Sequence, residues 1–237
     1  ETVLKLVDEI SKACTENGCI LVGGETSEQP GMLPIGRYVL QASILGIVDK
    51  SKIIDGNNIK QGDALIVLAS NGLHTNGYSL VRKLMETKAE ILNEKINGDS
   101  FLDSILQPHS SYSKPVKIIL ERYSDAIHGM AHITGGGIHD NLIRILQCEN
   151  LQADIDLSAI KIPQIFNIIK SYANISDDEM LTTFNNGVGL LVAVENKKTD
   201  DIISALNANG AEAYYVGQIN QSAGRKAVMF NNKLNWD

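Results

Sequence analysis

The sequence predicts an α/β fold, in the broader sense of an α+β layered arrangement of a sheet and its covering helices. Short runs of Val, Leu and Ile recur at strand length, as in ALIVLA at 64–69 and VGLLVAV at 188–194. Other segments carry apolar residues at helical spacing, such as Ile138, Leu142 and Ile145. Strands and helices mixed in this way along one chain are typical of domains in which helices pack against a sheet.

The first fifty residues predict the end of one domain. In order, they contain a helix at 2–17, a buried strand at 19–23, a long loop at 24–36 and a β-rich run at 38–48. A polar stretch follows at 49–62, where we expect a domain boundary. Residues 1–50 and 58–237 are therefore expected to belong to different domains.

The second part predicts a complete layered domain. Strands are expected at 64–69, 126–133, 151–156, 188–194, 213–219 and 226–231, and helices at 78–86, 101–107, 112–124, 138–147, 163–173, 177–182 and 198–208. Residues 87–100 are polar and predict irregular structure.

Composition excludes several classes of protein. The 237 residues carry a formal net charge of −7 without a basic cluster, which argues against nucleic-acid binding. No apolar stretch is long enough to span a bilayer, so no membrane partner is expected. Three cysteines without C-x-x-C spacing predict neither a disulfide framework nor a zinc site, and favour a cytoplasmic location.

The segment GGETSEQPGM at 23–32 is the first candidate site. Gly23 and Gly24 follow an apolar run and allow a close backbone approach to a ligand, while Glu25 and Thr26 add a carboxylate and a hydroxyl. A phosphorylated ligand or a metal is commonly bound by such a junction. A plain polar loop after a strand explains the same residues equally well.

The segment AHITGGG at 131–137 is the strongest local candidate for anion binding. Thr134, Gly135, Gly136 and Gly137 lie between an expected strand and an expected helix, where free amides suit a phosphate. His132 at the strand end can donate to a phosphoryl oxygen or transfer a proton. The alternative is a tight turn beside a packed histidine.

Two further junctions repeat this layout. In SNGLHTNG at 70–77, His74 and Asn76 offer a titratable nitrogen and an amide, although Asn76 serves equally well as a helix N-cap. In TFNNGVG at 183–189, Asn185 either orients a ligand or holds the turn.

The histidines do not predict a zinc site. His74, His109, His128 and His132 lie in different segments without metal-ligand spacing, and His139 follows in a helix.

Taken in order, these segments resemble the aminoimidazole ribonucleotide synthetase family, the phosphoribosylformylglycinamidine cyclo-ligases of purine biosynthesis. The matching stretches are GGETSEQPGM at 23–32, VDKSKIIDG at 48–56, GDALIVLASNGLHTNGYSLVRK at 62–83, AHITGGGIHDNL at 131–142 and EMLTTFNNGVGL at 179–190. Several segments in the right order and at the right spacing are far more specific than any one motif.

The resemblance implies a ligase that closes a C–N bond with ATP and Mg²⁺, converting formylglycinamidine ribonucleotide into aminoimidazole ribonucleotide through an iminophosphate. It also implies a homodimer with two α/β domains. Carried onto this sequence, it places His132, His74 and Asn76 in catalysis, Gly23, Gly24, Glu25, Thr26 and Thr134 to Gly137 at phosphate or ATP, Asn185 at the substrate, and Glu25 also at the metal.

One departure from the family is large. Its members carry a long N-terminal portion with a glycine-rich segment and acidic residues for ATP and metal, which this sequence does not contain. We therefore expect residues 1–50 to be the C-terminal part of an ATP-binding and dimerisation domain. Whether this chain alone is active stays open.

Two alternatives stay open as well. One is another ATP-dependent enzyme of the superfamily, of the selenophosphate synthetase, thiamine-monophosphate kinase or hydrogenase-maturation type, although EQPGM and AHITGGG favour the purine enzyme. The other is a non-catalytic binding or dimerisation module.

Overall fold

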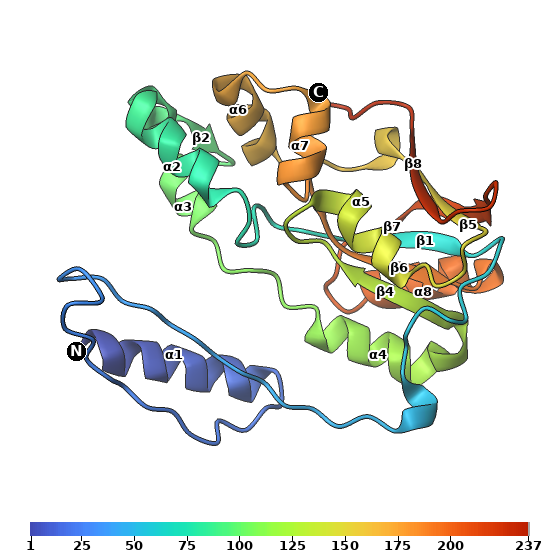
Figure 1. Cartoon of the computed structure of the whole chain (residues 1–237), viewed down its shortest axis with the longest axis horizontal. Helices are drawn as coiled ribbons and strands as arrows, with labels where there is room; N and C mark the ends of the chain where they lie inside the picture. Colours follow the sequence, from blue (N-terminus) through green and yellow to red (C-terminus); the bar gives the residue numbers. More distant parts are fainter. Residues whose placement is uncertain (237) are drawn as a thin grey trace. The chain divides into compact units, whose positions relative to one another are not determined.

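The computed structural model describes residues 1–236 and divides the chain into two compact units, Glu1–Ile53 and Ile54–Asp237 (Figure 1). The helices are α1 Thr2–Glu16, α2 Tyr78–Thr87, α3 Phe101–Ile105, α4 Ser113–Tyr123, α5 Gly137–Leu142, α6 Gln164–Ala173, α7 Asp177–Thr183 and α8 Thr199–Asn207. The strands are β1 Ala64–Ala69, β2 Lys95–Ile96, β3 Asp99–Ser100, β4 Ile127–His132, β5 Leu151–Asp156, β6 Val188–Val194, β7 Ala213–Gln221 and β8 Ala227–Asn231. None of the helices in residues 1–236 combines the length and apolar character needed to cross a membrane.

The N-terminal unit contains the predicted helix but neither predicted strand. The helix expected at 2–17 is α1, and an Asn17 N–H hydrogen-bonded to the carbonyl of Ala13 closes it. The strands expected at 19–23 and 38–48 are wrong, because both stretches lack strand structure. Apolar, β-branched residues favour a strand only where a neighbouring strand pairs with their backbone, and neither segment has such a neighbour among the described residues.

The second unit is built on a six-stranded sheet in the order β4-β6-β1-β7-β5-β8. All neighbours pair antiparallel except β5 and β8, which run parallel. The sequence prediction of a layered α/β fold is confirmed, with strand bounds at 64–69, 151–156 and 188–194 as expected.

Both faces of the sheet are covered, because its central strands are apolar on both sides. In β1, Leu65 and Val67 belong to a core cluster shared with α5, whereas Ile66 and Leu68 belong to a second cluster shared with α4 and α8. Every residue of β6 is buried. Continuous apolar runs of this kind are typical of strands enclosed between two layers.

A third cluster holds a helical lobe formed mainly by α2, α3 and α6. Phe101, Phe166 and Phe184 are fully buried in it, and the rings of Phe166 and Phe184 meet edge to face with centroids 5.7 Å apart. The stretch 87–100, predicted irregular, contributes a 3₁₀ turn at Ala89–Asn93 and the short β2–β3 hairpin.

The helix expected at 138–147 is shorter than predicted. α5 ends at Leu142 and continues as a single 3₁₀ turn at Ile143–Ile145. A Cβ atom added to Gly56 would lie only 2.0 Å from the carbonyl oxygen of Ile145. This turn therefore packs directly against the backbone of the loop before β1.

Candidate active site

The three glycine-and-polar junctions of the second unit meet at one edge of the sheet. β6 lies between β1 and β4 and runs antiparallel to both, so its beginning adjoins their ends. The Ser70 N–H donates to the Gly187 carbonyl at 2.9 Å, and the Ile133 N–H donates to the Gly189 carbonyl at 2.9 Å. Residues 70–77, 134–137 and 183–189 therefore form one site rather than three.

His74 is buried in this edge with a defined tautomer. Its side chain is 5% exposed and its backbone is left-handed, with φ of 58°. The Nδ2 of Asn71 donates to the Pro108 carbonyl at 2.8 Å, so the Oδ1 of Asn71 is the acceptor for His74 Nε2–H at 2.9 Å. The Nδ1 of His74 then carries the lone pair and has no hydrogen-bond partner among the described residues.

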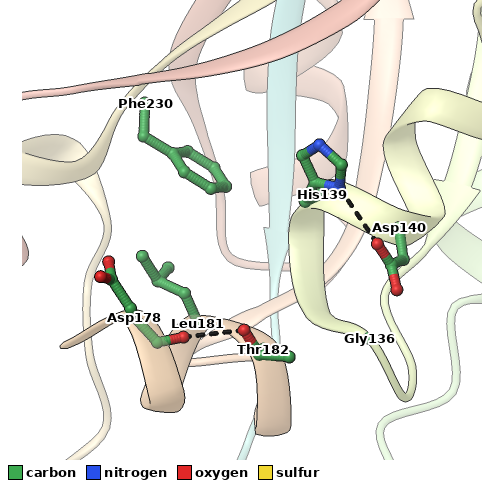
Figure 2. Close-up of a pocket in the computed structure, with 7 residues that line it drawn as sticks. All are labelled: Gly136, His139, Asp140, Asp178, Leu181, Thr182 and Phe230. Carbon is green, nitrogen blue, oxygen red and sulfur yellow. Dashed lines mark hydrogen bonds and ion pairs between the residues drawn. The ribbon is translucent and has the colours of Figure 1, made fainter. Parts of the chain in front are cut away.

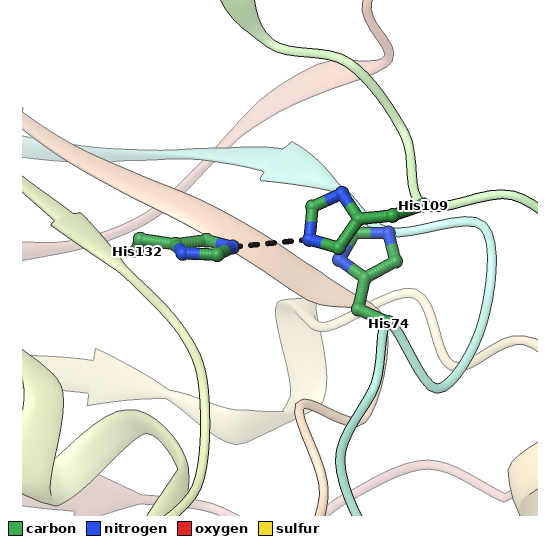
Figure 3. Close-up of side chains that lie close together, drawn as sticks. All are labelled: His74, His109 and His132. Atoms are coloured by element: carbon green, nitrogen blue, oxygen red, sulfur yellow. Dashed lines mark hydrogen bonds between the residues drawn. The ribbon is translucent and has the colours of Figure 1, made fainter. Parts of the chain in front are cut away.

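His109 joins His74 and His132 in one cluster (Figure 3). Its ring stacks on His74 with centroids 3.7 Å apart, and its Nε2 lies 3.2 Å from the Nε2 of His132. The sequence, which lacks metal-ligand spacing, did not indicate that these three would meet. Their segments are separate in the sequence, but β1, β4 and the loop before α4 bring them to the same edge.

The environment lowers the basicity of His74 and His132. Burial first, and then the neighbouring His109 and His132, lower the pKa of His74 from 6.5 to about 4. Burial and then His109 also lower the pKa of His132. Burial raises the pKa of Tyr112, whose hydroxyl donates to the Ala69 carbonyl at 2.8 Å. His74 and His132 are therefore neutral imidazoles at pH 7.

The lowered pKa of His74 predicts a pH-dependent stability. In the unfolded chain His74 takes up a proton below about pH 6.5, whereas in the folded chain it does so only near pH 4. The contribution of His74 to the free energy of unfolding is therefore complete above about pH 6.5 and is lost as the pH falls from 6.5 to 4. From pH 7 to pH 5 we expect this residue to remove about 2 kcal/mol. Urea unfolding of the wild type and His74→Gln at both pH values measures the difference; equal pH slopes would contradict it.

Asn141 fixes the glycine loop through hydrogen bonds of its side chain. This buried residue of α5 donates from Nδ2 to the Gly137 carbonyl at 2.7 Å and accepts at Oδ1 from the hydroxyl of Thr134 at 3.1 Å. Gly136 and Gly137 have φ of 88° and 64°, which glycine adopts without strain. The Thr134 hydroxyl and the backbone of this loop are thereby held in one conformation.

Asn76 lies across from this loop. A side-chain carbon on Gly135 would stand 3.6 Å from the Oδ1 of Asn76, so two of the predicted site segments are in near contact. The side chain of Asn76 is partly exposed, and α2 begins after Gly77 without a side-chain cap. The N-cap alternative for Asn76 is therefore wrong, and its amide is available at the site.

Asn185 connects the junctions at 70–77 and 183–189 by hydrogen bonds. It is fully buried; its Oδ1 accepts from the Ser70 hydroxyl at 2.8 Å and the Gly187 N–H at 2.9 Å, and its Nδ2 donates to the Gly72 carbonyl at 2.8 Å. These contacts make it a positioning residue for the loops. Its predicted contact with substrate stays a prediction.

The GGET segment lies in the other unit. Gly23, Gly24, Glu25 and Thr26 are exposed residues without helix or strand structure, and no atom lies within 4 Å of a carbon added to either glycine. Among residues 1–236, Glu25 does not belong to any group of three or more potential metal ligands. Roles for these residues in ATP or metal binding stay predictions.

A shallow pocket borders the glycine loop on its α7 side (Figure 2). It measures about 200 Å³ and is lined by Gly136, His139, Asp140, Asp178, Leu181, Thr182 and Phe230. His139 Nδ1 faces the Asp140 carboxylate at 3.0 Å. Two carboxylates on its wall disfavour a phosphate there, so the histidine side of the loop is the better anion site.

Sequence reasoning missed His109, Tyr112 and Asn141. His109 and Tyr112 lie in PHSSY at 108–112, a polar loop without glycine that carries no recognisable signal. Asn141 had one: it is a polar residue next to Leu142 on the apolar side of an expected helix. A buried amide there is typical of a side chain that satisfies a nearby loop.

Comparison with known proteins identifies the family. The family model described as "AIR synthase related protein, C-terminal domain" matches residues 60–229. The chain is 41% identical over 234 residues to a phosphoribosylformylglycinamidine cyclo-ligase of Syntrophus aciditrophicus, covering 97% of this chain and 66% of that protein. It is 40% identical over 226 residues to the one of Paraburkholderia xenovorans, covering 95% and 63%. The chain thus spans about 62–66% of the length of the curated relatives it matches.

Solved structures agree on the fold alone. A thiamine-monophosphate kinase from Stenotrophomonas maltophilia K279a aligns with a TM-score of 0.52 at 14% identity, covering 79% of this chain and 56% of that chain. E. coli HypE, a hydrogenase maturation protein, aligns with a TM-score of 0.50 at 15% identity, covering 75% and 48%. With the matching segments, the sheet and the family match all in agreement, the chain belongs to the AIR synthase related proteins and carries their C-terminal domain.

Proposed function

We propose that the protein carrying this chain closes the imidazole ring of aminoimidazole ribonucleotide from formylglycinamidine ribonucleotide, with ATP, in the cytoplasm. The observation that carries the proposal is the 40–41% identity to named phosphoribosylformylglycinamidine cyclo-ligases along 91–97% of the chain. The structural neighbours at 14–15% identity support the fold only.

In the proposed reaction, ATP transfers its terminal phosphoryl group to the formamide oxygen of the substrate and leaves as ADP. A nitrogen of the same substrate then attacks the activated carbon, the C–N bond forms, and phosphate departs with the former formamide oxygen. The attack is intramolecular, so the protein contributes by positioning and by neutralising charge rather than as a nucleophile.

The sheet edge supplies residues for these tasks. His132 is exposed at the end of β4, and in its neutral form it donates one ring N–H to a phosphoryl oxygen. The Thr134 to Gly137 loop, rigidified by Asn141, offers backbone groups to the departing phosphate. The neighbouring Asn76 amide and the buried His74 complete a neutral polar wall that fits a polar nucleotide substrate.

The described residues do not fit a Mg²⁺ ion. Glu25 supplies a single carboxylate on an exposed loop, whereas Mg²⁺ takes six oxygen ligands in octahedral geometry. No step is therefore assigned to Mg²⁺ through residues of this chain.

We propose that residues 1–50 belong to an ATP-binding and dimerisation domain, and that the protein acts as a homodimer.

His132→Ala tests the proposal. In the protein that contains this chain, ADP release should depend on formylglycinamidine ribonucleotide, and His132→Ala should lower kcat by about 100-fold because one donor to the transferring phosphoryl group is lost. His139→Ala, an exposed histidine paired with Asp140, is the matched control and should retain activity. Absence of substrate-dependent ADP release from the wild type would overturn the cyclo-ligase function, and full activity of His132→Ala would remove His132 from it.

A further inference from the structure

Three imidazoles at the sheet edge turn ring nitrogens toward one another. His74, His109 and His132 each offer one nitrogen, and these three atoms lie within 4.8 Å of one another. Figure 3 shows the stacked rings of His74 and His109 with a nitrogen of each on the side that faces His132. Among residues 1–236 no other group of three or more histidine, cysteine or carboxylate side chains is gathered so closely.

The position of His74 Nδ1 is fixed by the hydrogen bond on the other ring nitrogen. Its Nε2–H is committed to Asn71 Oδ1 at 2.9 Å, and Asn71 is itself anchored on the Pro108 carbonyl. The Ser110 N–H approaches the same Nε2 at 3.5 Å, too far to compete. The Nδ1 lone pair is left buried without a partner, in a side chain that is only 5% exposed. An unpaired buried acceptor is costly, and a bound ligand relieves it.

His109 has the same arrangement with its nitrogens exchanged. Its Nδ1–H donates to the Ser110 carbonyl at 2.7 Å, which leaves the Nε2 lone pair toward the cluster. A ring N–H that donates to a backbone carbonyl is the usual partner of a metal-binding imidazole. The Nε2 atoms of His109 and His132 are 3.2 Å apart, close to the separation of about 3.3 Å between two nitrogens bound to one tetrahedral ion.

We propose that His74 Nδ1, His109 Nε2 and His132 Nε2 bind one divalent transition-metal ion, with Zn²⁺ as the best fit. The ion takes the place of the proton that His132 Nε2 donates to His109, and His132 binds the ion as a neutral imidazole with its proton transferred to Nδ1. Three imidazoles without a carboxylate suit Zn²⁺, Ni²⁺ or Co²⁺ and not Mg²⁺ or Ca²⁺, which require oxygen ligands.

Metal binding requires a small movement of the His109 ring. His109 and His132 are both exposed, and His109 lies on the loop between α3 and α4, so its ring can leave the stack on His74 to complete the coordination. Three protein ligands leave a fourth position to water or to an oxygen of a ligand beside the glycine loop. The site follows from the contacts of these residues alone and does not rest on the proposed reaction.

Metal binding is measured without substrate or ATP. The chain is stripped with a chelator, Co²⁺ is titrated as a spectroscopic probe, and bound Zn²⁺ is counted after dialysis. We expect one ion per chain, with the visible absorption of Co²⁺ in a four- or five-coordinate nitrogen site. His109→Ala should weaken binding by more than about 100-fold, and Asn71→Ala, which frees His74, by about 10–100-fold. Both residues are exposed, so the variants should fold, as circular dichroism will verify.

His139→Ala is the matched control, because it removes an exposed histidine outside the cluster and should leave the affinity unchanged. Equal affinity of His109→Ala and the wild type would overturn the proposal. So would binding that disappears only in a Cys14→Ser, Cys19→Ser variant, or the absence of any one-to-one complex in the wild type. Because no turnover is measured, failure here leaves the proposed cyclo-ligase function untouched, and the reverse also holds.

Discussion

Gly137→Ala is expected to destabilise the second unit by about 3–5 kcal/mol, which lowers its melting temperature by about 10 °C. A side-chain carbon on Gly137 would stand 1.7 Å from the Leu181 carbonyl oxygen, a backbone atom of α7 that cannot rotate away. The backbone also has φ of 64°, where a non-glycine residue is strained. Either α5 and α7 separate or the loop changes its conformation.

Gly135→Ala is the matched control in the same loop. A carbon added there meets only Asn76 Oδ1 at 3.6 Å, an ordinary contact, and Gly135 does not have a positive φ. Thermal and urea unfolding of both variants should therefore separate them by at least about 2 kcal/mol. Equal stability would mean that the third glycine of this run serves a ligand rather than the packing of α7.

Asn185→Ala is the second large effect, with an expected loss of about 3–5 kcal/mol. The substitution removes three hydrogen bonds at once and leaves the Gly187 N–H without its acceptor in a site closed to water, while the Gly72 carbonyl loses one of its two donors. The Ser70 hydroxyl loses the closer of its two acceptors and is left with the Gly72 carbonyl at 3.1 Å. Chemical denaturation at pH 7 measures the change.

Asn76→Ala provides the comparison. Because the Asn76 amide is partly exposed, this substitution should lower the free energy of unfolding by less than about 1 kcal/mol. Asn185→Asp refines the test: it keeps an oxygen for the Ser70 hydroxyl but sets a second oxygen against the Gly72 carbonyl. We expect Asn185→Asp to remain strongly destabilised. A wild-type stability for Asn185→Ala would leave its predicted contact with substrate as its main role.

Local pattern was sufficient for most elements of the second unit. The runs at 64–69, 151–156 and 188–194 became strands with the expected bounds, because each is apolar or alternating over its full length. The same reasoning failed at 19–23 and 38–48, where equally apolar residues form no strand. A strand depends on hydrogen bonds to a neighbour, and the sequence of a segment does not tell whether that neighbour is present.

The sequence by itself determined the layered fold, the glycine junctions and the family, because each depends on local pattern or on segments matched in order. Only the tertiary structure decided which residues form the site. Ser70 and Asn185 are 115 residues apart in the sequence, and His109 and His132 are 23 apart, yet each pair is in hydrogen-bond contact. β6 lies between β1 and β4 and runs antiparallel to both, and this strand order carries three distant loops to one edge of the sheet.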